Sequence, residues 1–156
     1  MSISYGQELL VKVKFLSPLC KSENFNYATK HSAGLDLRAC IDQPISIQPQ
    51  EKQKIPTGIA LEITNPCVAG FIFSRSGLGT KQGIVVTQGV GVVDPDYRGE
   101  ILVSLFNLSS KIYTISPGER IAQLVFMPFF KANLLPSDVL SPTKRGDGGF
   151  GHTGNF

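Results

Sequence analysis

Residues 84–106 read IVVTQGVGVVDPDYRGEILVSLF and carry the strongest structural signal in the chain. Two apolar runs, 84–93 and 101–106, flank an acidic segment that contains a proline. Apolar runs that are rich in β-branched residues and separated by Asp and Pro are typical of paired strands. The stretch therefore predicts a β-hairpin with its turn near 94–96.

Short strands recur on both sides of this stretch. Apolar residues alternate with polar ones or form short runs, and prolines such as Pro44 and Pro56 separate the segments. One short helix is expected near 75–81, with Ser74 or Ser76 as its N-cap. This pattern predicts an all-β sandwich or barrel. The further strands expected are 9–15, 45–48, 59–64, 71–73 and 121–125.

The composition describes a folded chain with one domain. Its 156 residues are 42% hydrophobic and 17% charged, which excludes a disordered protein. The net charge of +3 is too small for an extended nucleic-acid footprint but permits a small anionic ligand. No apolar run approaches the length of about 18 residues that a membrane span needs.

The three cysteines, Cys20, Cys40 and Cys67, are far apart in the sequence and form no C-x-x-C pair. An odd number without such spacing argues against a disulfide framework and against a structural zinc site. The first residues have neither the basic start nor the long apolar run of a secretory signal. We therefore expect a cytoplasmic protein.

The last thirteen residues, 144–156, differ in composition from the rest because five of them are glycine. We expect a β-barrel domain at 1–143 and a flexible, glycine-rich C-terminal lid segment at 144–156. In such a lid Arg145 would bind phosphate and Phe150 would stack on a base, and a disordered tail is the alternative. The glycine spacing formally matches a dinucleotide fingerprint, but too few residues follow it to form the required helix.

Two polar motifs carry candidate chemistry. In GVVDPDYRG, residues 91–99, Asp94 would orient and deprotonate a water beside the ring of Tyr97, or the segment is an acidic turn. In SRSGLGTKQG, residues 74–83, the serines, the glycines and Arg75 suit a phosphate, or they form a capped helical turn. The residues alone leave both pairs of alternatives open.

Asp36, in AGLDLRAC at residues 33–40, stands between two leucines. A carboxylate in such a strand would pair with Arg38 or Arg75, or would hold a hydrated metal. Structural pairing is the more common role of such a residue. The two histidines have no third partner at metal-ligand spacing, which argues against a His-based zinc site.

The segment PGERIAQLVF, residues 117–126, predicts a turn followed by a strand. Ser116 and Glu119 have the spacing of a capping box, but the Pro-Gly pair between them favours a turn. Gln123 is a polar residue in an otherwise apolar strand, and a buried Gln needs hydrogen-bond partners. A neighbouring backbone group is the expected partner.

Five segments in this order resemble the five motifs of the trimeric deoxyuridine triphosphate nucleotidohydrolases, the dUTPases. They are AGLDLRA, SRSGLG, GVVDPDYRG, PGERIAQLVF and RGDGGFGHTG, and they extend from Ala33 to Gly154. The resemblance implies a jelly-roll β-barrel subunit in a homotrimer, with active sites assembled from all three chains. It also implies Mg²⁺-assisted hydrolysis of dUTP to dUMP and pyrophosphate, which keeps uracil out of DNA and supplies dUMP for thymidylate synthesis.

The same resemblance implies roles for individual residues. Asp94 would align and deprotonate the water that attacks the α-phosphate, and Tyr97 would pack under the deoxyribose. Asp36 would help to hold the hydrated Mg²⁺ through water. The residues implied to bind the base, the phosphate chain or the closing tail are Arg75, Ser76, Gly77, Gln88, Gly91, Val92, Gln123, Arg145, Phe150 and Gly151.

Gln88 departs from the family pattern, because the family commonly has Asn six residues before the catalytic Asp. Two other functions stay open. A dCTP deaminase on the same barrel needs an acid–base residue, typically Glu, and none lies in the hairpin before Asp94. A trimer that senses nucleotide without hydrolysing it is the second alternative, and the presence of Asp94, Tyr97, Arg145 and Phe150 argues against it.

Overall fold

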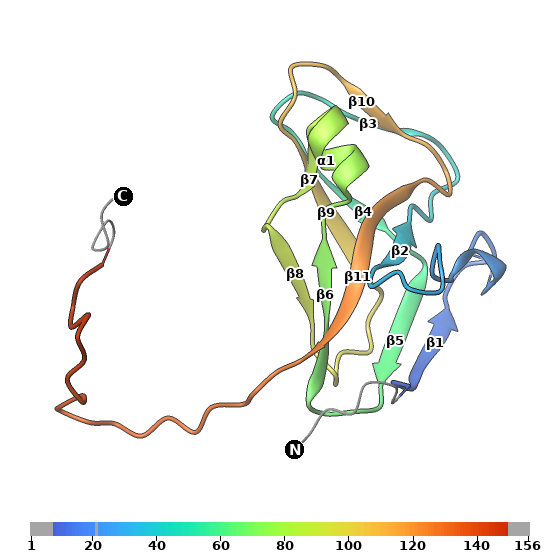
Figure 1. Cartoon of the computed structure of the whole chain (residues 1–156). Helices are drawn as coiled ribbons and strands as arrows, with labels where there is room; N and C mark the ends of the chain where they lie inside the picture. The colour runs from blue at the N-terminus through green and yellow to red at the C-terminus, as the bar shows by residue number, and fades with distance from the viewer. Residues whose placement is uncertain (1–7, 21, 150–156) are drawn as a thin grey trace.

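The computed structural model describes residues 8–20 and 22–149, and most of its regular structure is β-strand (Figure 1). Within these residues the helices are α1 (Ser76–Gln82) and the short 3-10 helix η1 (Ser22–Asn24). The predicted all-β class with one short α-helix is confirmed. The strands are β1 (Val11–Phe15), β2 (Leu35–Arg38), β3 (Ile45–Ile47), β4 (Lys52–Pro56), β5 (Ile59–Ile63), β6 (Val68–Phe73), β7 (Ile84–Val86), β8 (Val90–Val93), β9 (Leu102–Asn107), β10 (Tyr113–Ile115) and β11 (Arg120–Pro128).

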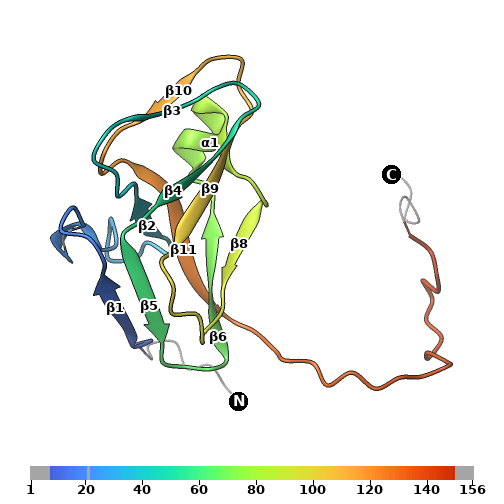
Figure 2. The same cartoon turned by 180° about the vertical axis from the view of Figure 1, so that it is seen from behind.

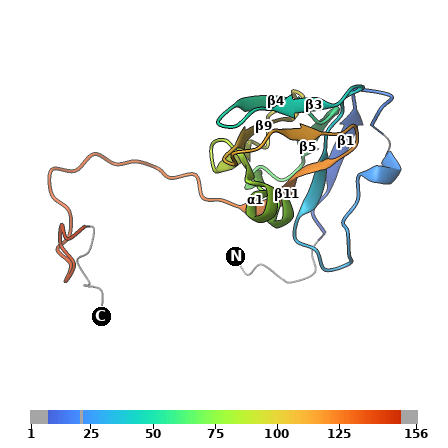
Figure 3. The same ribbon diagram turned by 90° about the horizontal axis from the view of Figure 1, so that it is seen from above.

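The strands form antiparallel sheets. One sheet has the order β2-β11-β6-β8 and a second has the order β4-β9-β7, while β1 pairs with β5 and β3 with β10. Seen from behind, β4 and β9 cross in front of β11 and β6, and the view from above also places them in separate layers (Figures 2 and 3). The chain therefore has the predicted jelly-roll β fold, with its two main sheets face to face.

The hydrophobic core lies between these sheets and follows the period of two that strands impose. In β9, Val103 and Leu105 are 1% and 0% exposed, whereas Leu102 is 50% exposed. Each large apolar side chain that is fully buried stabilises the fold by roughly 1.5–3 kcal/mol. The largest fully buried apolar side chains are Leu37, Ile47, Ile55, Ile84, Leu105, Ile115, Ile121, Leu124 and Val103.

The hairpin predicted for residues 84–106 is confirmed for 84–86 and wrong for 90–93. β7 pairs with β9, but β8 pairs with β6 in the other sheet. Between β7 and β8 the Gly89 N–H donates to the Val86 carbonyl at 3.0 Å, and Gly89 adopts a φ of 76°. This tight turn carries the chain from one sheet to the other. The apolar run 84–93 is therefore two strands, and periodicity does not reveal a change of sheet.

The helix α1 lies where a short helix was expected, but its predicted cap is wrong. Its N-cap residue is Arg75, whose side chain makes no capping bond. Ser74 instead accepts the Val86 N–H at 2.8 Å, and Ser76 is the first helical residue. Gly83 ends the helix in the left-handed conformation, with a φ of 70°. Neither helix in the described ranges is long and apolar enough to cross a membrane.

After β11 the chain leaves the barrel. Residues 129–149 contain no helix or strand and run away from the sheets in all three views (Figures 1–3). This segment carries many exposed apolar side chains, which is typical of a segment that packs against another surface. The regular structure thus ends well before residue 144. The exposed apolar residues of this segment include Phe130, Leu134, Leu135, Val139 and Leu140.

Candidate active site

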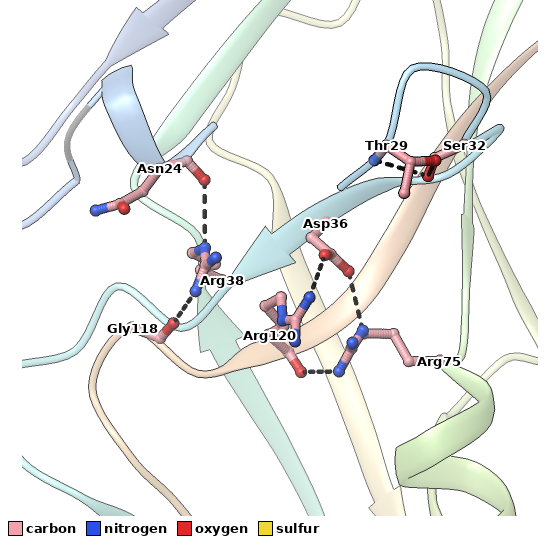
Figure 4. Close-up of polar contacts among 8 residues, drawn as sticks. All are labelled: Asn24, Thr29, Ser32, Asp36, Arg38, Arg75, Gly118 and Arg120. Atoms are coloured by element: carbon pink, nitrogen blue, oxygen red, sulfur yellow. Dashed lines mark hydrogen bonds and ion pairs between the residues drawn. The ribbon is translucent and has the colours of Figure 1, made fainter. Parts of the chain in front are cut away.

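Asp36 of β2 accepts hydrogen bonds from two arginines (Figure 4). Arg75 Nε lies 2.9 Å from Asp36 Oδ1, and Arg120 Nη1 lies 3.1 Å from Asp36 Oδ2. Arg75 Nη1 also donates to the Arg120 carbonyl at 3.1 Å. We call these three residues the arginine array. One carboxylate between two guanidiniums leaves a net positive charge, which suits the binding of phosphate.

The pairing of β2 with β11 brings the arginine array together. Asp36 lies opposite Gln123, and Arg120 is the first residue of β11. Arg75 occupies the junction between β6 and α1. The side chains of Asp36 and Arg75 are 15% and 26% exposed, so water and salt screen their attraction less than that of a surface pair.

Arg38 has other partners than Asp36. Its Nε donates to the Asn24 carbonyl at 3.2 Å and its Nη1 to the Gly118 carbonyl at 3.0 Å (Figure 4). Of the two arginines expected to pair with Asp36, Arg75 is confirmed and Arg38 is wrong, because backbone carbonyls take up the Arg38 guanidinium. Sequence reasoning did not single out Arg120, although it lies in the 117–126 segment, because its contact with Asp36 depends on the pairing of two distant strands.

Gln123 of β11 is held beside the arginine array. Its Nε2 donates to the Ser74 carbonyl at 3.0 Å, which confirms the expected backbone partner. A Cβ atom on Gly34 would collide with the carboxamide of Gln123. The glycine therefore leaves the space that this side chain occupies, next to the residue that precedes Arg75.

Glu119 holds the turn before β11. The Tyr113 hydroxyl donates to one of its carboxylate oxygens, and the Ser116 N–H donates to the other at 2.9 Å. Burial and the adjacent Glu119 carboxylate raise the pKa of Tyr113 above its ordinary range. Gly118 adopts a φ of 74°, so the predicted Pro-Gly turn is confirmed. This turn fixes the point at which Arg120 begins β11.

A second group of predicted site residues lines a pocket of about 210 Å³ beside β8. Gln88, Gly91, Val92, Asp94 and Tyr97 all belong to its wall. The backbone of β8 is accessible here, because β8 is an edge strand of its sheet. The pocket thus combines the carboxylates of Asp94 and Glu100, one carboxamide, one aromatic ring and a strand edge.

The turn that follows β8 fixes Asp94 and Tyr97 relative to each other. The Tyr97 N–H donates to the Asp94 carbonyl at 3.1 Å, and the Tyr97 hydroxyl donates to the Glu100 carbonyl at 3.0 Å. A Cβ atom on Gly99 would collide with the Tyr97 ring. Glycine at this position therefore lets the ring lie across the turn, at the same wall of the pocket as Asp94.

Asp94 and Arg75 lie at opposite ends of β6, although the pocket wall itself extends from Gln88 to Asp94 along β8. Val93 of β8 is paired with Gly70 near the start of β6, and Asp94 directly follows Val93. Arg75 follows the other end of β6. Gly70 and Arg75 are about five residues apart, on the order of 16 Å along a strand. Within the part of the chain that the structure describes, Asp94 and Arg75 are therefore not brought together.

The other predicted phosphate-binding residues divide between the barrel and the tail. Ser76 and Gly77 form the first turn of α1, directly after Arg75. Arg145 lies in the extended tail, away from both clusters, and its Nε donates to the Gly148 carbonyl at 2.9 Å. Phe150 and Gly151 lie outside the described residues.

The donor groups near Asp36 suit a hydrated magnesium ion better than a bare one. Residues 8–20 and 22–149 contain no group of three or more His, Cys, Asp or Glu side chains that could hold a metal. Both Asp36 oxygens accept from arginines, but each carboxylate oxygen can accept a second hydrogen bond, such as one from a metal-bound water. Magnesium keeps several waters and binds through one or two carboxylates plus substrate phosphates. The residues therefore fit an ion that arrives with a phosphate chain.

Comparisons with known proteins point to one family. The dUTPase family model matches residues 21–154. A deoxyuridine 5′-triphosphate nucleotidohydrolase of Idiomarina loihiensis is 52% identical over 128 residues, which are 82% of this chain and 85% of the relative. The corresponding protein of Psychromonas ingrahamii is 48% identical over 146 residues, or 92% of this chain and 97% of the relative.

Solved structures agree with these relatives. The Staphylococcus bacteriophage 80alpha dUTPase with dUPNHPP is 27% identical, with a TM-score of 0.81 over 93% of this chain and 98% of its own. A mutant dUTPase of phage phi11 of S. aureus, described as coordinating a structural Mg(II) ion, shares the fold at 23% identity and a TM-score of 0.75, over 85% of this chain and 99% of its own. Since the family model spans most of the sequence and relatives near half identity cover more than four fifths of it, this chain belongs to the dUTPase family.

Proposed function

We propose that the chain is a dUTP diphosphatase, which hydrolyses dUTP to dUMP and pyrophosphate by attack of water on the α-phosphate. The observation that carries this proposal is the place of Asp94, at the wall of a pocket and in one turn with Tyr97. A carboxylate fixed in this way aligns a water and accepts its proton. The reaction would keep uracil out of DNA and supply dUMP for thymidylate synthesis.

The pocket beside β8 is the proposed site of the deoxynucleoside. The ring of Tyr97 is 47% exposed and is free to pack under the deoxyribose, where a 2′-hydroxyl would collide with it. The free backbone edge of β8 at Gly91 and Val92 pairs with the edge of uracil, and the Gln88 carboxamide lies next to Gly91. Cytosine presents a donor where uracil presents an acceptor, so such a site rejects it by ~10⁴-fold.

Arg75, Ser76, Gly77 and Gln123 are proposed to bind the phosphate chain. Asp36 positions Arg75 by accepting a hydrogen bond from its Nε. Ser76 and Gly77 lie in the first turn of α1, where backbone N–H groups lack intrahelical acceptors. Water attack on a phosphorus atom crowded by negative charge needs alignment and charge neutralisation more than covalent chemistry. The net positive charge of the arginine array supplies part of that neutralisation.

Magnesium is the proposed cofactor, and a mutant dUTPase of phage phi11 is described as coordinating a structural Mg(II) ion. Such an ion would neutralise part of the negative charge of the triphosphate. Asp36 is the residue of this chain proposed to hold one of its waters, through lone pairs that the arginines leave free.

We further propose a homotrimer whose active sites are shared between chains. A distance of about 16 Å along β6 separates Asp94 from Arg75 in one chain, which favours a site in which one chain supplies Asp94 and another supplies Arg75. The lid segment 144–156 of the 1–143 barrel domain, with Arg145, Phe150 and Gly151, would then close over a site that other subunits build. The exposed apolar residues of 129–149 supply the contact area for such an assembly.

The test is pyrophosphate release with Mg²⁺ from dUTP, UTP, dCTP and dTTP in parallel. Release from dUTP alone is expected, and it would also show that the site tolerates Gln88. Ammonia release from dCTP would identify a deaminase instead. Binding of a non-hydrolysable dUTP analogue without pyrophosphate release from dUTP would identify a nucleotide sensor.

A further inference from the structure

Cys20 and Cys40 are distant in the sequence but lie against the same glycine. A Cβ atom on Gly58 would fall inside the van der Waals surface of both sulfur atoms. Gly58 has a φ of 67°, and the two thiols share the space that a side chain at this position would fill. Because both sulfurs crowd the same α-carbon, they are direct neighbours.

The two cysteines belong to different parts of the chain. Cys20 lies in the connection 16–34 between β1 and β2, where its N–H donates to the Ser17 carbonyl at 3.0 Å. Cys40 follows β2, and its N–H donates to the Pro56 carbonyl at 2.8 Å. A bond between the two sulfurs would therefore fasten a long connection to the end of a core strand and enclose residues 20–40.

A reagent in solution has a route to this pair. Cys20 lines a second pocket, together with Leu19, Phe25 and Thr57. Both cysteines are partly exposed, and the Cys20 thiol donates to the Thr57 carbonyl at 3.2 Å. Thiol–disulfide exchange requires such access to the sulfur.

The surroundings of Cys20 slow the oxidation of the pair. Burial, the neighbouring Cys40 thiol and the Glu100 carboxylate raise the pKa of Cys20 to about 12. A small fraction of thiolate makes exchange slow. In a reducing cytoplasm, the compartment proposed for this protein, the pair then stays reduced until an oxidant persists.

We propose that Cys20 and Cys40 form a reversible disulfide when the protein meets a low-molecular-weight disulfide such as oxidised glutathione. One cysteine thiolate attacks a sulfur of the oxidant and releases one molecule of thiol. The second cysteine thiolate then attacks the mixed disulfide, forms the Cys20–Cys40 bond and releases a second thiol. The protein loses two electrons and two protons, and the oxidant gains them as two thiols.

The test uses the full wild-type chain, folded, with oxidised glutathione, followed by acid quenching and alkylation of free thiols. Intact mass should show a species that carries no alkyl group on Cys20 or Cys40, and dithiothreitol added before alkylation should restore both groups. Trypsin cleaves after lysine and arginine, so peptide 15–21 should be linked to peptide 39–52. The linked protein should unfold at a temperature higher by about 5–10 °C, because the bond closes a loop of some twenty residues.

The exposed Cys67 provides the matched control. Cys67→Ser should give the same linked peptides, whereas Cys20→Ser and Cys40→Ser should carry glutathione on the remaining thiol of the pair and give none. Glutathione adducts on both Cys20 and Cys40 of the wild type without a link would overturn the proposal. So would unmodified thiols at both positions in the folded protein. The wild-type result does not depend on the folding of any variant.

Discussion

Arg75 Nε lies 2.9 Å from Asp36 Oδ1, although the two residues are 39 positions apart in the sequence. The other oxygen of the same carboxylate accepts from Arg120. Two guanidiniums that approach one carboxylate would repel each other without it. Asp36 therefore positions Arg75, and this role is separate from any contact with a metal-bound water.

Replacing Asp36 by Asn tests this positioning role. The neutral amide keeps the shape of the side chain but offers one acceptor oxygen to two arginines. We expect the variant to fold and its kcat/KM for dUTP to fall by about 10²-fold, because Arg75 is displaced from the phosphate chain. Steady-state pyrophosphate release measures the loss. Lys12→Ala, which removes the exposed Lys12–Glu62 ion pair, is the control and should leave the kinetics unchanged.

Asp94→Asn tests the water-orienting carboxylate. Asn cannot accept the proton of the attacking water, so kcat should fall by roughly 10²–10⁴-fold. The affinity for a non-hydrolysable dUTP analogue should stay close to that of the wild type, since the pocket wall is otherwise intact. Titration calorimetry and turnover, measured on the same preparation, give both quantities. Loss of analogue binding in a folded variant would count against the role of Asp94.

Local patterns predicted the fold class and the turns of this chain, but not the partners of its strands. The Pro-Gly turn before β11 and the glycine-bounded helix α1 depend on residues a few positions apart. The pairing of residues 84–93 with two different sheets depends on contacts far along the chain. Apolar residues that alternate with a period of two show which side chains of a strand face the core. They do not show which other strand lies beside it.

The same contrast between local and long-range contacts applies to the residues of the candidate site. Asp94 and Tyr97 lie in one contiguous segment, so the sequence alone grouped them. Arg120 reaches Asp36 only because β11 pairs with β2, and Cys20 meets Cys40 only because both pack over Gly58. Such neighbours become visible when the register of the strands is known.

Gly58→Ala should destabilise the chain more than Gly118→Ala does. Both glycines have a positive φ, at 67° and 74°, so alanine costs about 1–2 kcal/mol of backbone energy at either position. At Gly58 the new methyl group would also displace the sulfurs of Cys20 and Cys40, whereas a Cβ on Gly118 has open space. Overpacking of this kind adds about 1–3 kcal/mol. Urea unfolding of the two variants measures the difference, and equal losses would refute the crowding at Gly58.

The free energy of unfolding should fall at alkaline pH. Burial and Cys40 raise the pKa of Cys20 from 9.0 to about 12, and burial and Glu119 raise the pKa of Tyr113 above 10.0. Below pH 9 the folded and the unfolded chain both keep these protons, so the stabilisation is fully present. As the pH rises towards 12, the unfolded chain releases protons that the folded chain retains, and stability is lost.

Urea unfolding midpoints at about pH 8, 9 and 11 would measure this loss. Tyr113→Phe and Cys20→Ser each remove one of the two groups and should flatten the decline. Lys12→Ala, at an exposed ion pair, should keep the slope of the wild type. If the unfolding midpoint of the wild type did not change over this pH range, the result would contradict the raised pKa values of Cys20 and Tyr113 in the folded chain.

Mixing two inactive variants tests whether the active site is shared. Asp94 and Arg75 lie at opposite ends of β6, so in a shared site one chain supplies the carboxylate and another supplies the guanidinium. Asp94→Asn and Arg75→Ala should each have little activity alone. When the two are unfolded together and refolded in equal amounts, about a quarter of the sites in a symmetric assembly should contain both intact residues. Pyrophosphate release should recover to about that fraction of wild-type turnover.

The control is to refold Asp94→Asn with the variant that carries both Asp94→Asn and Arg75→Ala, because no chain in that mixture has Asp94. Activity that stays at the level of the separate variants would mean that one chain supplies both residues.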